Sequence, residues 1–348
     1  MKKFKRHRDY GFFDQDIRLS KLSQLGDPLE KLNNHVDFEV FRPILEDKLI
    51  IIPKGKGGRP PYDYVLLFKI LILQRYYNLS DDQIEYQIND RMSFMRFLNL
   101  TIADDIPDSK TVWKFREQLI ELGIILDLFT LFNSKLESMG LIVHQGRIVD
   151  ASFVEVPKQR NSKEDNDQIK GGEIPESIRK NPAKLSQKDT DARWAKKNNV
   201  SYFGYKNHVK VDTHSKLIIK YEVTDASVHD SQLIDNLLDK EDEGLLLYAD
   251  SAYTGEENQR LVKDRKMKSL ICEKAYKNKP LTELQKLFNK EKSRVRSRVE
   301  HLFGFMENSM NGMYLFNIGK KRIEGIIGLM NLTYNMFRKI QLLSVSKG

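Results

Sequence analysis

Three acidic residues that lie far apart in the sequence stand in contexts suited to divalent metal ions. Asp150 and Asp250 each follow a short apolar run, in residues 146–150 and 244–250, and Glu300 lies in a basic segment. Carboxylate oxygens are preferred ligands of Mg²⁺ and Mn²⁺. Two such ions can clamp the attacking and leaving oxygens of a phosphoryl displacement. We therefore predict that Asp150, Asp250 and Glu300 bind Mg²⁺ or Mn²⁺, as two ions.

Two buried strands and one helix must bring these acids together. Short apolar runs are typical of strands covered on both faces, and sites in such sheets collect at strand ends. Residues 293–306 have the spacing of a helix, with one apolar face formed by Val295, Val299, Leu302 and Met306. Arg296 and Glu300 are one turn apart on a neighbouring face. A surface ion pair is the alternative interpretation of this pair.

Five motifs that include these acids follow one another along the chain: Val149–Ala151, Phe203–His208, Thr224–Asp230, Ala249–Tyr253 and Arg298–Gly304. On these motifs, residues 36–335 resemble DDE transposases of bacterial insertion sequences, in the insertion-sequence-5 group of the insertion-sequence-4 superfamily. The resemblance implies an α/β fold: a ribonuclease-H-like catalytic domain, with a mixed sheet flanked by helices, preceded by an all-helical N-terminal domain. It also implies that Asp150, Asp250 and Glu300 are catalytic.

The resemblance further implies the reaction. The expected activity is metal-dependent cleavage at the terminal inverted repeats of a transposon, followed by strand transfer. In the superfamily signature of Tyr, Arg, Glu and Lys, Arg296 fits the Arg position, but Ser293 and Glu307 replace the Tyr and Lys. Arg296 and His229 are expected to lie just outside the three acids. The alternatives are a nuclease without strand transfer and a DNA-binding protein with a relic catalytic domain.

The apolar pattern divides the chain into parts. Residues 62–77 are apolar almost all round, which predicts a buried central helix. Residues 80–83 form a capping box, with Ile84, Tyr86 and Ile88 expected to face inward, and Asp108 is expected to cap another helix. We predict a basic arm (1–35), a helical DNA-binding domain (36–140), a catalytic domain with a polar, irregular insertion at about 157–200 (141–318), and a C-terminal helix (319–348).

Candidate DNA contacts lie in three places. Lys110, Lys114 and Arg116 are the expected exposed basic residues of the helix after Asp108, in a region that packs as a helix-turn-helix or as a dimerisation domain. Trp194 either stacks on an unpaired base or pins the insertion to the catalytic domain. Lys292, Arg294 and Arg298 form a basic stretch beside Glu300. The basic arm of residues 2–8 either contacts DNA or is a solvated terminus.

Composition agrees with a protein that binds double-stranded DNA. The net charge is +9 and charged residues make up 31% of the 348 residues, which favours a polyanionic partner. The single cysteine, Cys272, excludes an intramolecular disulfide and a thiolate zinc cluster. The glycine-rich loop at residues 55–61 lacks the Gly-Lys-Ser/Thr ending of a nucleotide-binding loop. We expect a bacterial, cytoplasmic, nucleoid-associated homodimer on transposon ends and target DNA, without a signal peptide or membrane span.

Overall fold

The computed structural model describes residues 11–49, 60–276 and 279–345. The predicted basic arm of residues 2–8 and residues 55–59 of the glycine-rich loop lie outside these ranges. Within the described ranges, no helix is both long and apolar enough to cross a bilayer.

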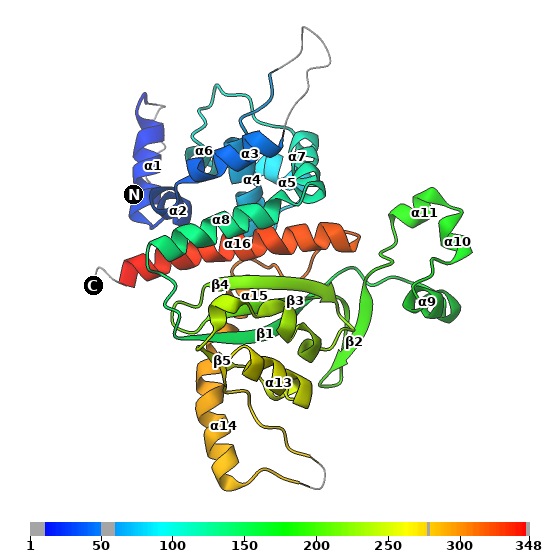
Figure 1. The fold of residues 1–348 in the computed structure, drawn as a ribbon. Coiled ribbons are helices and arrows are strands. Elements are labelled where there is room, and N and C mark those ends of the chain that lie inside the picture. Colours follow the sequence, from blue (N-terminus) through cyan, green and yellow to red (C-terminus); the bar gives the residue numbers. More distant parts are fainter. Residues whose placement is uncertain (1–10, 50–59, 277–278, 346–348) are drawn as a thin grey trace, which may run out of the picture.

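Short helices fill the first part of the chain and form what we call the helical region (Figure 1). They are α1 (Asp14–Gln24), α2 (Pro28–His35), η1 (Phe38–Phe41), α3 (Arg42–Lys48), α4 (Tyr64–Tyr77), α5 (Asp81–Asp90), α6 (Met92–Leu98), α7 (Ser109–Glu121) and α8 (Ile124–Ser138). Residues 14–35, expected as part of an arm, thus form two helices. Leu29 and Leu32 of α2 are buried in the common core.

Sequence and local structure agree closely for the central helices. Helix α4 is buried on nearly all sides, and the Asp63 carboxylate caps it. Ser80 and Gln83 form the predicted capping box of α5. The prediction for Tyr86 was wrong: its side chain is 66% exposed, whereas Ile84 and Ile88 are fully buried. The physical reason is helical spacing, because positions four apart share a face and the position midway between them does not.

A mixed sheet forms the second half of the protein. Its strands are β1 (Gly146–Glu155), β2 (Arg193–Lys197), β3 (Val200–Asp212), β4 (Ile218–Asp225), β5 (Leu246–Tyr248) and β6 (Lys268–Ser269). β1 pairs antiparallel with β3, and β3 pairs antiparallel with β4. On its other side β1 pairs parallel with β5, which pairs parallel with β6. Three antiparallel strands followed by two parallel ones confirm the predicted ribonuclease-H-like topology.

Both faces of the sheet are covered, as the apolar strands require. On one face, Val149 and Leu247 pack against α12 (Ile234–Leu237) and α13 (Glu256–Asp264). The 3₁₀ turn η2 (Asp230–Leu233) leads into α12, and the turns η3 (Lys240–Asp242) and η4 (Ser251–Tyr253) follow it before α13. On the other face, Ile148 belongs to the core that also contains the helical region. The sheet therefore shares one hydrophobic core with the helices that precede it.

The polar insertion carries more regular structure than its composition predicts. It contains α9 (Lys163–Lys170), α10 (Glu176–Arg179) and α11 (Pro182–Ser186), and it ends in β2. Figure 1 shows these helices projecting to one side of the sheet. Ser162 and Asn181 cap α9 and α11 through their side chains, which a search for apolar periodicity does not detect.

The long helix α16 (Lys320–Val345) lies between the sheet and the helical region (Figure 1). Buried asparagines fix its position. The side chains of Asn331 and Asn207 of β3 exchange hydrogen bonds of 2.8 and 3.2 Å. Asn335 accepts from the Ile218 amide at 2.9 Å and donates to the Ile218 carbonyl at 2.8 Å and to Asn133 of α8 at 2.9 Å. One helix thus joins α8 to two strands through polar contacts inside an apolar core.

This geometry predicts the effect of Asn335→Ala. The substitution leaves the Ile218 amide without its partner in a site closed to water, so the free energy of unfolding should fall by about 2–3 kcal/mol. Chemical denaturation measures this. Asn236→Ala, at an exposed position of α12, is the matched control and should change stability by less than about 0.5 kcal/mol. Equal stability of the two variants would show that the buried amide is not structurally important.

Candidate active site

Asp150 lies in the middle of β1, opposite Val209 of β3. Its side chain is nearly buried, and one carboxylate oxygen accepts a hydrogen bond of 2.9 Å from the Ala151 amide. Burial raises the pKa of Asp150 to about 6; the Ala151 hydrogen bond and the Arg296 charge oppose this rise, and the nearby Asp250 charge adds to it. The site therefore holds a carboxylate whose negative charge is poorly solvated and needs a cation beside it.

The cation beside Asp150 is the guanidinium of Arg296. Its Nη1 lies 2.7 Å from Asp150 Oδ2, and its Nη2 lies 3.0 Å from Glu300 Oε1. Burial by itself would lower the pKa of Arg296, but the charges of Asp150, Glu300 and Asp250 raise it overall. Arg296 therefore interacts with all three predicted acids at once.

Glu300 reaches this cluster from the start of a new helix. The predicted continuous helix over residues 293–306 is instead two helices, α14 (Glu283–Arg296) and α15 (Arg298–Asn308), which meet at Ser297. The Glu300 amide donates to the Ser297 carbonyl at 3.0 Å, three residues back, so the chain tightens at the junction. Val299, Leu302 and Met306 are fully buried as predicted. They anchor α15, while the Glu300 side chain is 62% exposed.

Asp250 follows β5 and begins the turn η4, where it accepts a hydrogen bond of 2.8 Å from the Ala252 amide. Beside it lies Tyr253, whose hydroxyl is buried and has no hydrogen-bond partner. Burial raises the pKa of Tyr253 well above its ordinary value, and the charges of Asp150, Asp230 and Asp250 add to the rise. No role was predicted for Tyr253 from the amino-acid sequence. Its position just after the acid that ends a buried strand was the available signal.

The donor set fits hard divalent cations, although the acids are not arranged around an ion. The carboxylate oxygens of Asp150 and Glu300 lie around the Arg296 guanidinium, and carboxylate oxygens suit Mg²⁺ or Mn²⁺. In the described ranges no three His, Cys, Asp or Glu side chains are close enough to hold a metal. The guanidinium of Arg296 lies between Asp150 and Glu300 and contacts both.

His229 does not contact the three acids. Its side chain is exposed, caps η2 and hydrogen-bonds to Ser231 at 2.8 Å. Its neighbour Asp230 instead forms an ion pair of 2.8 Å with Lys206 of β3.

His208, two residues further along β3, is fully buried. Its Nε2 forms a hydrogen bond of 2.9 Å with the Thr224 hydroxyl. Burial lowers the pKa of His208 to about 4, so its imidazole is neutral near pH 7.

Some of the predicted DNA-contacting residues are exposed, and others form hydrogen bonds within the protein. Lys110, Lys114 and Arg294 are exposed. Lys292 and Arg298 donate to the carbonyls of Ile271 and Thr213 at 3.0 and 2.7 Å, and so hold the two helices that flank Ser297.

Arg116 and Trp194, the remaining two predicted DNA contacts, both pack against other parts of the chain. Arg116 was expected to be exposed, and this was wrong: it is 6% exposed and ion-paired with Asp81 at 2.6 Å. Arg116 lies among the buried residues of α7, and the Asp81 carboxylate balances its charge there. Trp194 is half-exposed and its ring packs 5.0 Å from that of Phe203, which ties β2 to β3.

Comparison with known proteins places these features in a family. Residues 142–336 match the family model described as "Transposase DDE domain", and residues 17–118 match "Transposase domain (DUF772)". A piggyBac transposase, solved by cryo-EM as a synaptic complex with hairpin DNA, has 13% sequence identity and a TM-score of 0.44. That similarity covers 94% of this chain and 77% of the other. At this level it carries no information on function.

The position of Arg296 predicts how the acids respond to metal. Arg296→Gln removes a positive charge that competes with a divalent ion for Asp150 and Glu300, so the affinity for Mn²⁺ in the absence of DNA should rise about tenfold. Isothermal titration calorimetry measures this. Arg294→Gln removes an exposed charge from the same helix and should leave the affinity within about twofold. Weaker binding of Mn²⁺ by the Arg296→Gln variant would show that this guanidinium does not compete with the metal for the two acids.

Proposed function

Because this chain belongs to the transposase DDE domain family, we propose that it cuts DNA at the ends of a transposon and joins the freed ends to target DNA. The observation that carries the proposal is the cluster of acids from β1, η4 and α15 around Arg296. These acids are distant in sequence, and their common interaction with Arg296 supports a site at which two ions would hold a phosphate. The five motifs further support placement in the insertion-sequence-5 group.

In this proposal Asp150, Asp250 and Glu300 hold two divalent ions, Mg²⁺ or Mn²⁺. When bound, such ions activate the attacking oxygen and stabilise the leaving oxygen of an in-line displacement. Asp150, on the rigid strand β1, supplies a fixed ligand. Glu300, in the first turn of α15, would complete the set of ligands with Asp150 and Asp250.

The protein's remaining contribution is to position DNA. Lys110 and Lys114 on α7 and Arg294 on α14 are free to contact phosphates, which fix orientation without reading sequence. His229 and Trp194 are exposed near the sheet and are proposed to contact DNA or the acids only in the complex. We propose a homodimer on double-stranded DNA, which would place one active site at each transposon end.

Asp250→Asn tests the catalytic assignment. The amide keeps the size and the cap of η4 but loses the negative charge needed to bind a cation, so cleavage should fall by at least about 10³-fold. Binding of a terminal-repeat duplex should remain within about twofold. Gel assays of cleavage and of mobility measure both on the same protein. Asp264→Asn, an exposed acid on α13, is the control and should cleave normally. Cleavage by Asp250→Asn at the normal rate would refute the assignment.

A pre-cut transposon end tests strand transfer. A duplex with a free 3′ hydroxyl needs no first cleavage, so joining it to a supercoiled plasmid reports only the second reaction. The wild-type protein with Mn²⁺ should produce joined plasmid and Asp250→Asn should not. Cleavage without joining would identify a nuclease, and neither activity in the presence of metal would identify a relic DNA-binding protein.

A further inference from the structure

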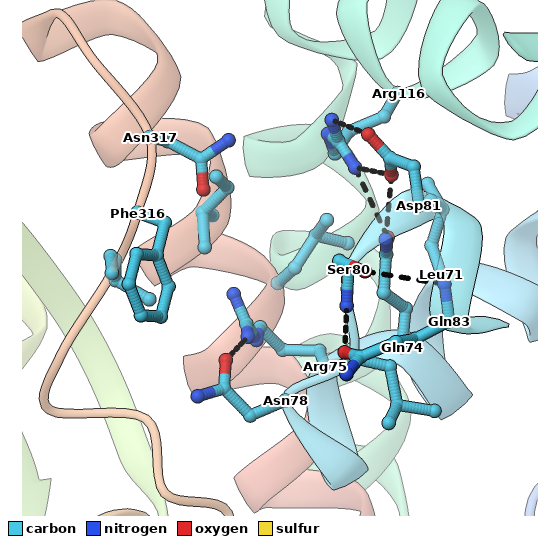
Figure 2. Close-up of a pocket in the computed structure, with 14 residues that line it drawn as sticks. Leu71, Gln74, Arg75, Asn78, Ser80, Asp81, Gln83, Arg116, Phe316 and Asn317 are labelled. Atoms are coloured by element: carbon cyan, nitrogen blue, oxygen red, sulfur yellow. Dashed lines mark hydrogen bonds and ion pairs between the residues drawn. The ribbon is translucent and has the colours of Figure 1, made fainter. Parts of the chain in front are cut away.

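A pocket of about 430 Å³ lies between the helical region and the loop that precedes α16 (Figure 2). One wall is made by α4, α5 and α7, and the other by residues 315–317 and the first turns of α16. Asn78, at the end of α4, donates to the Asn311 carbonyl at 2.8 Å and holds the two walls together. The pocket is large enough for one nucleotide-sized ligand.

The wall on α4 carries a buried positive charge that no acid balances. Arg75 is only 8% exposed, its Nε has no hydrogen-bond partner, and its one side-chain hydrogen bond goes to the Asn78 amide oxygen. No acidic side chain in the described ranges forms an ion pair with it. Burial and the nearby Arg116 charge lower the pKa of Arg75 to about 10. Buried arginines are normally paired, so this one is costly to the free protein.

The acidic residue that lines the pocket, Asp81, already forms hydrogen bonds with other side chains. Asp81 accepts two hydrogen bonds from Arg116, at 2.6 and 3.0 Å, and one from Gln74 at 2.7 Å. Figure 2 shows this group packed together on one side of Arg75. Two guanidinium groups and one carboxylate therefore line the pocket, which leaves an excess of positive charge next to unused N–H donors.

The opposite wall presents an aromatic ring. Phe316 is 75% exposed although its neighbour Leu315 is buried, and Figure 2 shows it with Asn317 facing the pocket across from Arg75. The Leu315 amide donates to the Glu155 carbonyl at 2.9 Å, so this loop is fixed to the end of β1. An exposed ring on a fixed backbone is a ready surface for stacking a base.

We propose that this pocket binds one unpaired nucleotide of the DNA substrate, with its phosphate against Arg75 and its base stacked on Phe316. The ligand supplies the negative charge that Arg75 lacks, through charge-assisted hydrogen bonds of the kind that arginine forms with phosphate. That the nucleotide comes from DNA rests on the proposed function. The pocket would then hold a displaced base at the boundary between the helical region and the catalytic sheet.

The test compares three probes on the full-length protein: inorganic phosphate, dAMP and a short 5′-phosphorylated single-stranded oligonucleotide. Arg75→Gln should weaken all three by about tenfold or more, because each has a phosphate. Phe316→Leu should weaken dAMP and the oligonucleotide by about tenfold and leave inorganic phosphate unchanged, because only these two have a base. Calorimetry measures the first two probes, and fluorescence anisotropy measures the oligonucleotide.

Matched variants separate binding from folding. Arg260→Gln and Tyr86→Leu, which change an exposed arginine and an exposed tyrosine elsewhere, should bind every probe normally. Thermal unfolding of Arg75→Gln should be unchanged or shifted upward, because the substitution removes an unpaired buried charge. Normal binding of all probes by Arg75→Gln and Phe316→Leu would overturn the proposal. So would a marked fall in the unfolding temperature of Arg75→Gln together with normal binding by Phe316→Leu.

The same variants distinguish this inference from the proposed function. If Arg75→Gln and Phe316→Leu lose nucleotide binding while the wild-type protein cuts transposon ends, both proposals stand. If wild-type protein cuts ends and the two variants bind the probes normally, only the pocket inference fails. If the variants lose binding but wild-type protein cuts no DNA with Mn²⁺, the pocket binds nucleotides and the proposed function fails.

Discussion

The structure depends on the burial of polar side chains of α16 inside an otherwise apolar core. Asn331 and Asn335 are fully buried and are satisfied only by Asn207, Ile218 and Asn133, on β3, β4 and α8. Buried amides of this kind accept few alternative positions, because any shift leaves a donor or acceptor without a partner. The last long helix of the chain therefore sets how the sheet and the helical region are placed relative to each other. The site on β1 and the pocket beside α4 both rely on that placement.

A second constraint is the balance of charge around β1. Asp150 is buried where its charge is poorly solvated, and Arg296 supplies the compensating cation while also contacting Glu300. The Arg296 charge thus offsets the mutual repulsion of Asp150, Glu300 and Asp250. The break between α14 and α15 lies directly beside this residue, at Ser297.

The pocket at Arg75 contains a buried charge that, unlike Asp150, has no ion-pair partner among the described residues. Arg116 is paired with Asp81, but Arg75 has no acid, and the pocket opens beside an exposed ring. One arginine is thus neutralised within the chain and the other is left for a partner. Such an imbalance lowers stability in the free protein and is the kind of local conflict that natural sequences tolerate at functional sites. The pocket and the acid cluster are formed by different elements of the chain.

Helices with strong caps, the apolar runs that end at Asp150 and Asp250, and the residue types of the acid cluster could all be predicted from the amino-acid sequence. Ser80–Gln83, Asp108 and the apolar runs before Asp150 and Asp250 act locally, so a single sequence reveals them. The position of Arg296 between Asp150 and Glu300, the burial of Arg116 and the lack of an acidic partner for Arg75 among the described residues became clear from the folded structure. These outcomes depend on contacts between residues up to 146 positions apart. Charge balance at a buried position is a property of everything packed around it, and spacing along the chain does not encode it.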